Sequence, residues 1–338
     1  MPNVRLQDVA VLAGVSIKTV SNVVHDHPVV RPETRDRVQR AIDQLGYRPN
    51  LRGRSLATGR TGMLTLAFPS LLNPYFAELA HVFSAVAAER GYRLLLEETG
   101  AEEDGERQAL SGREAGIVDG ILFHPETLSP VQIAQLSADL PLVLLGEEPA
   151  PIGNDRVMID NVAAVGDAVR HLLGLGRRRI GFLGHELDRL SHTSHMRLVG
   201  YQQGLEAAGL TLDRNLLIPS AGDAAGGERA LARALDDGLQ IDGLICRHDL
   251  IAIGALRALA ARGITVPDQV ALIGWDDISL AAELSPSLTS VQPELSVLAG
   301  RALDLLAERI DGYDGIGRHE IVGHRLAVRE SAPAAATR

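Results

Sequence analysis

The sequence predicts a small all-α head followed by an α/β core of two doubly wound parallel-sheet lobes. Residues 6 to 45 carry apolar side chains at helical spacing. From Met63 onward, continuous apolar runs of strand length alternate with longer helical segments, in two successive series. Such alternation is typical of parallel sheets covered by helices on both faces, and two series indicate two lobes.

The first predicted element is a pair of short helices within residues 6 to 24, LQDVAVLAGVSIKTVSNVV. Gly14 permits the reversal between them because it has no Cβ atom. Ser16 occupies the N-cap position of the second helix, where its hydroxyl can accept a hydrogen bond from a backbone amide. This pattern is typical of a helix-turn-helix, whose second helix enters the DNA major groove, although a bare helical hairpin fits the pattern too.

A third helix is expected from Pro32 to Leu45, where apolar residues at i, i+3, i+4 and i+7 can cover the first two helices. Gly46 ends it and Pro49 blocks its continuation. Residues 50 to 58 could form a helix of only about two turns, which is marginal in water. We therefore expect this segment to order only when something stabilises it.

The two series of strands predict a cleft between the lobes. The helix expected over residues 295 to 311 and the strand-like run 320 to 328 around Gly323 would return the chain to the first lobe and then to the second. Ligands of such sheets lie beyond the carboxyl ends of the strands. Polar or aromatic residues cluster at these ends in both halves: Asn73, Tyr75, Phe76, His124, Glu147, His185, His248, Asp249, Asp276 and Asp277.

Charge is divided unevenly along the 338 residues. The chain has a net charge of -10, but residues 1 to 60 contribute +5 and the remainder -15. A basic head on an acidic body is expected when only the head meets phosphate. Because aromatic residues make up only 3% of the chain, single-strand binding by base stacking is not expected.

Composition also argues against several classes of protein. Lys18 is the only lysine, so no lysine remains for a phosphate-binding GxxxxGK loop. The single cysteine, Cys246, permits no intrachain disulfide and suits a reducing cytoplasm. No apolar run approaches about 18 residues and no cationic-hydrophobic leader opens the chain, so neither membrane insertion nor secretion is expected.

Two clusters suggest chemistry that their spacing does not support. His192 and His195, with His185 nearby, suggest zinc, but the HxxH pattern lacks the acid and a suitably spaced third ligand. Asp276 and Asp277 could be paired catalytic carboxylates, but adjacent side chains diverge. Asp276 as a ligand acceptor and Asp277 as a capping acid for the next segment is simpler. We predict no catalytic residue, metal site or cofactor.

The whole chain resembles the lac repressor and galactose repressor family of bacterial transcription regulators. The resemblance rests on seven motifs in order: the first two helices, VRPETRDRVQRAIDQLGYRPN, RSLATGRTG, NPYF, RLVGYQQGL, IGWDD and LTSVQP, with IDN at 159 to 161 and HD at 248 to 249 in addition. It implies a helix-turn-helix DNA-binding domain and a periplasmic-binding-protein-like core, in a homodimer on a pseudo-palindromic operator. The expected parts are a DNA-binding domain (1–49), a hinge helix or linker (50–61) and a bilobed effector-binding and dimerisation domain (62–338), with an N-lobe of about 62–161 and 293–322 and a C-lobe of about 162–292 and 323–338.

The resemblance also implies DNA-contacting residues. Ile17, Lys18 and Asn22 would read bases, with the remaining contacts at Ser16, Thr19, Ser21, His25 and Asn50, and Leu56 would be a wedge in the minor groove. The family often has Arg where this chain has Asn22, and Asn suits adenine rather than guanine. Gly53 stands where Ala is usual, which weakens the hinge helix.

By the same resemblance, the effector cleft would contain Asn73, Tyr75, Phe76, His124, Glu147, Arg197, His248 and Asp276. An Arg and an Asp facing one ligand can bond neighbouring hydroxyls, as a sugar or related polar metabolite requires. We expect a cytoplasmic, nucleoid-associated, dimeric repressor that is controlled by such an effector and is not an enzyme. The competing class is a solute-binding or enzymatic α/β protein with an incidental helical head.

Overall fold

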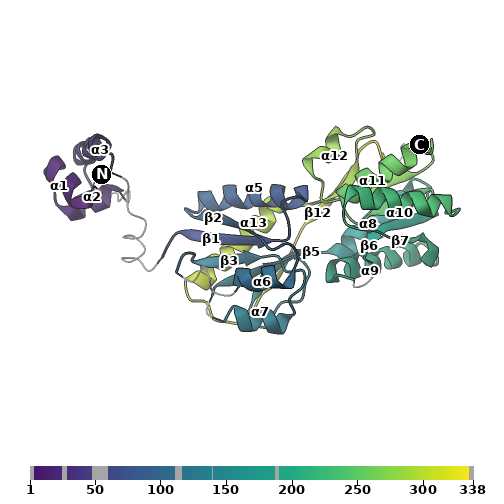
Figure 1. Cartoon of the computed structure of the whole chain (residues 1–338), viewed down its shortest axis with the longest axis horizontal. Coiled ribbons are helices and arrows are strands. Elements are labelled where there is room, and N and C mark those ends of the chain that lie inside the picture. The colour runs from purple at the N-terminus through teal and green to yellow at the C-terminus, as the bar shows by residue number, and fades with distance from the viewer. Residues whose placement is uncertain are drawn as a thin grey trace. The chain divides into compact units, whose positions relative to one another are not determined.

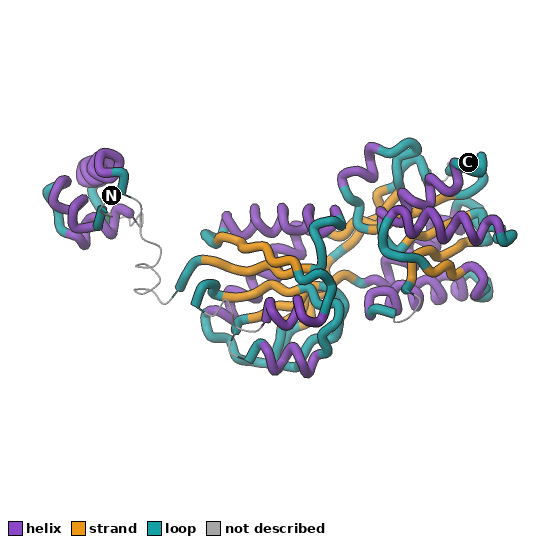
Figure 2. Tube along the Cα trace, viewed as in Figure 1, coloured by secondary structure: helices purple, strands orange, loops and turns teal. Residues whose placement is uncertain are grey.

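The computed structural model describes residues 4–24, 29–47, 60–110, 116–138, 140–186 and 190–334. The chain divides between Thr61 and Gly62 into two compact units. Figure 1 labels the helices and strands, and Figure 2 colours them by type.

The first unit is a three-helix domain made of α1 (Leu6–Ala13), α2 (Ile17–Val24) and α3 (Pro32–Leu45). Gly14 adopts a left-handed conformation with φ of 62° and ends α1. Val9, Val20 and Val38 are fully buried in the small core, because each faces the other two helices. The predicted helical pair and its third covering helix are thus confirmed.

The N-lobe of the second unit is a six-stranded parallel sheet in the order β11-β5-β4-β3-β1-β2. Its four central strands carry runs of buried apolar residues, as expected where helices cover both faces. The elements are β1 (Met63–Phe68), α5 (Pro74–Glu89), β2 (Arg93–Glu98), α6 (Glu103–Leu110), β3 (Gly120–Phe123), α7 (Pro130–Leu136), β4 (Leu142–Leu145), β5 (Asp155–Ile159), α13 (Leu295–Ile310) and β11 (His319–Val322).

The C-lobe repeats this plan with a sheet in the order β12-β10-β9-β8-β6-β7, in which only the β10–β12 pair is antiparallel. Its elements are α8 (Asn161–Gly174), β6 (Ile180–His185), α9 (His192–Ala207), a 3-10 turn (Arg214–Leu216), β7 (Leu217–Pro219), α10 (Ala224–Asp236), β8 (Gly243–Cys246), α11 (Asp249–Ala260), β9 (Ala271–Trp275), α12 (Ser279–Glu283), β10 (Thr289–Pro293) and β12 (His324–Ala327). The prediction of two doubly wound lobes is confirmed.

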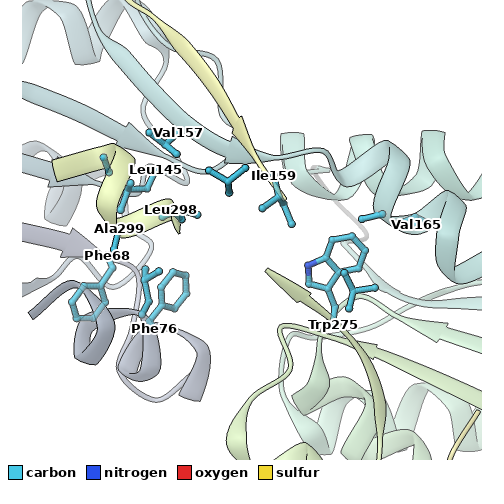
Figure 3. Packing of buried hydrophobic residues seen from close by; sticks show 14 of the residues in the cluster. Phe68, Phe76, Leu145, Val157, Ile159, Val165, Trp275, Leu298 and Ala299 are labelled. Carbon is cyan, nitrogen blue, oxygen red and sulfur yellow. The ribbon is translucent and has the colours of Figure 1, made fainter. Parts of the chain in front are cut away.

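Three segments join the lobes. The chain crosses from β5 to α8, returns from β10 to α13, and crosses again at Gly323, between β11 of one sheet and β12 of the other. One apolar cluster continues from lobe to lobe, with Phe68 and Phe76 on one side and Trp275 on the other (Figure 3). The carboxyl ends of the strands therefore face each other across the lobe junction.

Candidate ligand cleft and nucleic-acid interface

A cavity of about 270 Å³ lies between the two lobes, at the carboxyl ends of the strands. The ends of both sheets contribute to it because the lobes face each other there. All eight predicted effector residues line this cavity: Asn73, Tyr75, Phe76, His124, Glu147, Arg197, His248 and Asp276. Their elements lie far apart in the sequence, so the tertiary fold brings them together.

Arg197 is the central cation of the cavity and is only 8% exposed. Its guanidinium carbon lies 3.9 Å from the centre of the Trp275 ring, in a cation–π contact. Its Nε donates to Asn161 Oδ1 at 2.7 Å, and Nη1 donates to the carbonyl oxygen of Arg247. These contacts fix the plane of the guanidinium before any ligand binds.

Asp276 faces Arg197 from the end of β9. Among the described residues, none donates a hydrogen bond to its carboxylate, and burial raises the pKa of this group well above its ordinary value. The positive charge of Arg197 acts in the opposite direction and lowers the pKa. The Asp276 carboxylate lines the cavity and has no donor among the described residues there, so it is available to accept a hydrogen bond from a ligand hydroxyl.

Two imidazoles on opposite walls of the cavity also have a ring nitrogen that lacks a hydrogen-bond partner among the described residues. Within the described part of the chain, Nδ1 of His124 and Nδ1 of His248 are buried without a hydrogen-bond partner. Burial lowers the pKa of both rings, so both are neutral at pH 7 and each can donate or accept one bond. The His124 ring also packs edge-on against Phe76, with centroids 5.1 Å apart.

Glu147 lines the cavity, but its carboxylate also joins the lobes. Oε1 accepts from Asn161 Nδ2 at 2.6 Å, and Oε2 accepts from Thr193 Oγ1 at 2.8 Å. Thr193 belongs to α9 of the C-lobe, whereas Glu147 follows β4 of the N-lobe. Both oxygens of this predicted effector residue therefore already have protein partners.

Some residues that line the cavity were not predicted, notably Glu126, Arg247 and Trp275. A signal existed, because each ends a strand or lies within three residues of a strand end, and each lies within two positions of a residue that was predicted. Burial raises the pKa of Glu126 to about 7, against the opposing charge of Arg247. Arg247 in turn forms an ion pair with Glu186.

The predicted capping role of Asp277 is wrong. The backbone amide of Ile278, which precedes α12, donates instead to Asp249 Oδ2 at 2.9 Å. The Asp277 carboxylate accepts from Arg329 and Gln292. Asp249 lies 29 residues earlier in the chain, so local spacing could not reveal it.

Neither a zinc site nor a membrane-spanning helix is found among the described residues. Among them, no three His, Cys, Asp or Glu side chains are grouped as a metal ion requires, and the rings of His192 and His195 lie 6.3 Å apart. Over the same residues, no helix is both long and apolar enough to cross a bilayer.

In the first unit, α2 presents the predicted DNA-contacting residues. Ile17 is 49% exposed and Lys18 is exposed, whereas Thr19, Ser21 and Asn22 are half-buried. Val20 and Val23 on the opposite side are buried, so one face packs while the other meets solvent. The predicted residues His25, Asn50 and Leu56, and also Gly53, lie outside the described part of the chain.

Ser16 stands before α2, where the backbone turns into the helix. Its Oγ accepts a hydrogen bond from the Thr19 amide at 3.1 Å and lies 2.9 Å from Thr19 Oγ1. Its hydroxyl therefore satisfies one of the amides left over at the start of the helix.

In comparison with known proteins, the three-helix unit and the bilobed unit each match a family. Residues 5–50 match the family described as bacterial regulatory proteins, lacI family, and residues 169–332 match the periplasmic binding protein-like domain. The transcriptional regulator AscG of Escherichia coli is 33% identical over 91% of this chain and 92% of its own.

Two solved structures are similar in fold. A putative LacI-family transcriptional regulator from Sanguibacter keddieii is 39% identical over 81% of this chain and 99% of its own, with a TM-score of 0.75. A complex of the transcriptional regulator CelR with cellobiose is 30% identical over 97% of this chain and 99% of its own, with a TM-score of 0.72. Because similarity to AscG spans both the three-helix unit and the bilobed core, the chain belongs to the lacI family of bacterial regulatory proteins, which are DNA-binding transcriptional regulators and not enzymes.

Proposed function

We propose that this chain is a dimeric repressor whose affinity for a pseudo-palindromic operator is controlled by a sugar or related polar metabolite bound between its lobes. It would act in the cytoplasm, at the nucleoid. Its expected parts are the DNA-binding domain (1–49), the hinge (50–61) and the effector-binding and dimerisation domain (62–338).

One observation carries the effector proposal: Asp276 and the oriented guanidinium of Arg197, which lies over the Trp275 ring, face each other within one cavity. A carboxylate that lacks a protein donor and a fixed cation can bond neighbouring hydroxyls of a sugar. The cellobiose complex of CelR, a relative of similar length, supports the same class of ligand.

The DNA proposal rests on α2. Ile17, Lys18 and Asn22 would read base edges in the major groove, with Ser16, Thr19, Ser21, His25 and Asn50 nearer the backbone and Leu56 in the minor groove. Asn22 suits the N6 and N7 atoms of adenine. We expect an adenine at the base pair that it contacts.

The test uses the full-length chain. Selection from random duplex DNA should yield a palindromic sequence, and binding to it should weaken steeply with salt because phosphate contacts release counterions. Cellobiose and a panel of other sugars are then added, and one of them should change the operator Kd by about 5- to 150-fold.

Asp276→Ala should abolish that change while leaving operator binding without sugar intact. A sugar response that survives in Asp276→Ala would place the effector elsewhere. Failure to select any preferred sequence would contradict operator recognition itself.

A further inference from the structure

The turn that follows β9 has an unusual backbone. Asp276 and Asp277 both have positive φ angles, of 100° and 51°, and neither is glycine. Such angles are unfavourable for side chains with a Cβ atom and persist only where the surroundings hold them. Since Asp276 faces the ligand cavity, the groups that hold this turn also determine where its carboxylate points.

Asp277 is held by side chains from two other segments. Its carboxylate accepts from Arg329 Nη1 at 2.6 Å and from Gln292 Nε2 at 2.5 Å. Its backbone amide donates to Ser290 Oγ at 3.0 Å. The residue is thereby fixed at its side chain and at its backbone.

The backbone on both sides of Asp277 is held as well. The amide of Asp276 donates to the Val291 carbonyl oxygen at 2.9 Å, and the amide of Ile278 donates to Asp249 Oδ2 at the same distance. Ser290 Oγ donates to the other oxygen of Asp249 at 2.7 Å. This bond links the acceptor of the Asp277 amide to the acceptor of the Ile278 amide.

Of the residues that hold this turn, Arg329 lies farthest from Asp277 in the sequence, at a separation of 52 residues. It follows β12, after the third crossing between the lobes, and its Nη1 also donates to the Leu288 carbonyl oxygen at 2.7 Å. Its backbone amide donates to Thr289 Oγ1 at 2.8 Å. The guanidinium is therefore fixed independently of Asp277, so it can act as an anchor rather than follow the turn.

We propose that Arg329 and Asp277 are a pair of positioning residues, which hold the strained turn so that the Asp276 carboxylate faces the cavity and Trp275 stays packed beneath Arg197. Neither residue lines the cavity, so each would act through its neighbour. Only the expected effect on sugar binding rests on the proposed function.

The first measurement needs no ligand. Trp275 is the only tryptophan in the chain, is 1% exposed and directly precedes the turn, so its fluorescence reports local packing. In Arg329→Gln we expect emission at longer wavelength and quenching by acrylamide that increases at least about two-fold, because loss of a bond to a charged group releases the turn.

Two further variants test the pair itself. Asp277→Asn removes the charge but keeps a residue that tolerates positive φ, so it should give the same fluorescence change as Arg329→Gln. Arg329→Lys, which keeps the charge, should restore part of the native spectrum. Arg262→Gln is the matched control, because Arg262 pairs with Asp236 on the C-lobe surface and does not line the cavity.

An unchanged Trp275 spectrum in both Arg329→Gln and Asp277→Asn would overturn the proposal, as would an equal change in Arg262→Gln. If cellobiose binds the native chain, its Kd should rise by about tenfold in Arg329→Gln and stay unchanged in Arg262→Gln. If cellobiose does not bind, the choice of sugar fails while the fluorescence result still decides the role of the pair.

Discussion

At the scale of single residues, the cleft depends on how buried charges are compensated. Burial lowers the pKa of Arg197, whereas the carboxylates of Asp276 and Glu147 raise it. Asn161 Oδ1 accepts a hydrogen bond from Arg197 Nε. A buried charge that loses a partner is strongly destabilising, so each of these neighbours serves the fold as well as any ligand.

Glu126 should make the stability of the core depend on pH. Burial raises the pKa of Glu126 from 4.5 to about 7. Between these two pH values, the folded chain therefore binds a proton at Glu126 that the unfolded chain does not bind. Stability from this group is greatest below about pH 4.5 and is lost as the pH rises through about 7. Asp249, whose pKa is also raised to about 7 by burial, acts in the same direction.

We therefore expect Glu126→Gln to raise the melting temperature at pH 8 and to change it less at pH 5. Thermal unfolding by circular dichroism at several pH values measures this. Glu89→Gln, which alters an exposed carboxylate on α5, should leave the pH profile as it is. A pH profile of Glu126→Gln that matches the native chain would show that the Glu126 carboxylate has no raised pKa.

At the scale of elements, α2 is too short to be stable alone. A helix of eight residues in water depends on its cap and on tertiary packing. Ser16 supplies the cap through the Thr19 amide, and Val20 and Val23 supply the packing. The buried face of α2 and the cap at its N-terminus therefore stabilise the helix whose exposed face would read DNA.

Ser16→Ala should destabilise α2 by about 1 kcal/mol, because the Thr19 amide loses its acceptor. Amide hydrogen exchange without DNA measures this separately from any contact that Ser16 makes to phosphate, and exchange within residues 17–24 should accelerate. Ser16→Asn, which can cap the helix, is the control and should exchange close to the native rate. Native exchange in Ser16→Ala would mean that the cap adds nothing to α2.

At the scale of the bilobed unit, hydrogen bonds cross between the lobes beside the cavity. Glu78 of α5 accepts from the backbone amide and the hydroxyl of Ser279, at 2.7 and 2.8 Å. Glu148 accepts from the amide of His192 at 2.9 Å. These bonds favour an arrangement in which both walls contact a ligand together.

Glu78→Ala should weaken sugar binding by about tenfold, although Glu78 does not line the cavity, because fewer molecules would hold both walls in place. Titration of Trp275 fluorescence with the sugar found in the panel measures the Kd. Glu89→Ala removes an exposed carboxylate from the same helix and should bind as the native chain does. Equal affinity in Glu78→Ala would exclude this bond from control of the cleft.

The fold could be predicted from the sequence, because helical and strand periodicities and the glycine at a turn are local properties. The strand-end pattern also indicated seven of the eight predicted cavity residues, since the carboxyl ends of parallel strands lie at one edge of a sheet. Arg197 lies within α9 and was indicated only by the resemblance to the family. The hydrogen-bond partners of these residues became known only from the folded chain. Asp249 bonds Ile278, Glu147 bonds Thr193 and Arg329 bonds Asp277, across separations of 29, 46 and 52 residues. Such hydrogen bonds depend on distances and angles between distant segments, and no local pattern of residue types encodes them.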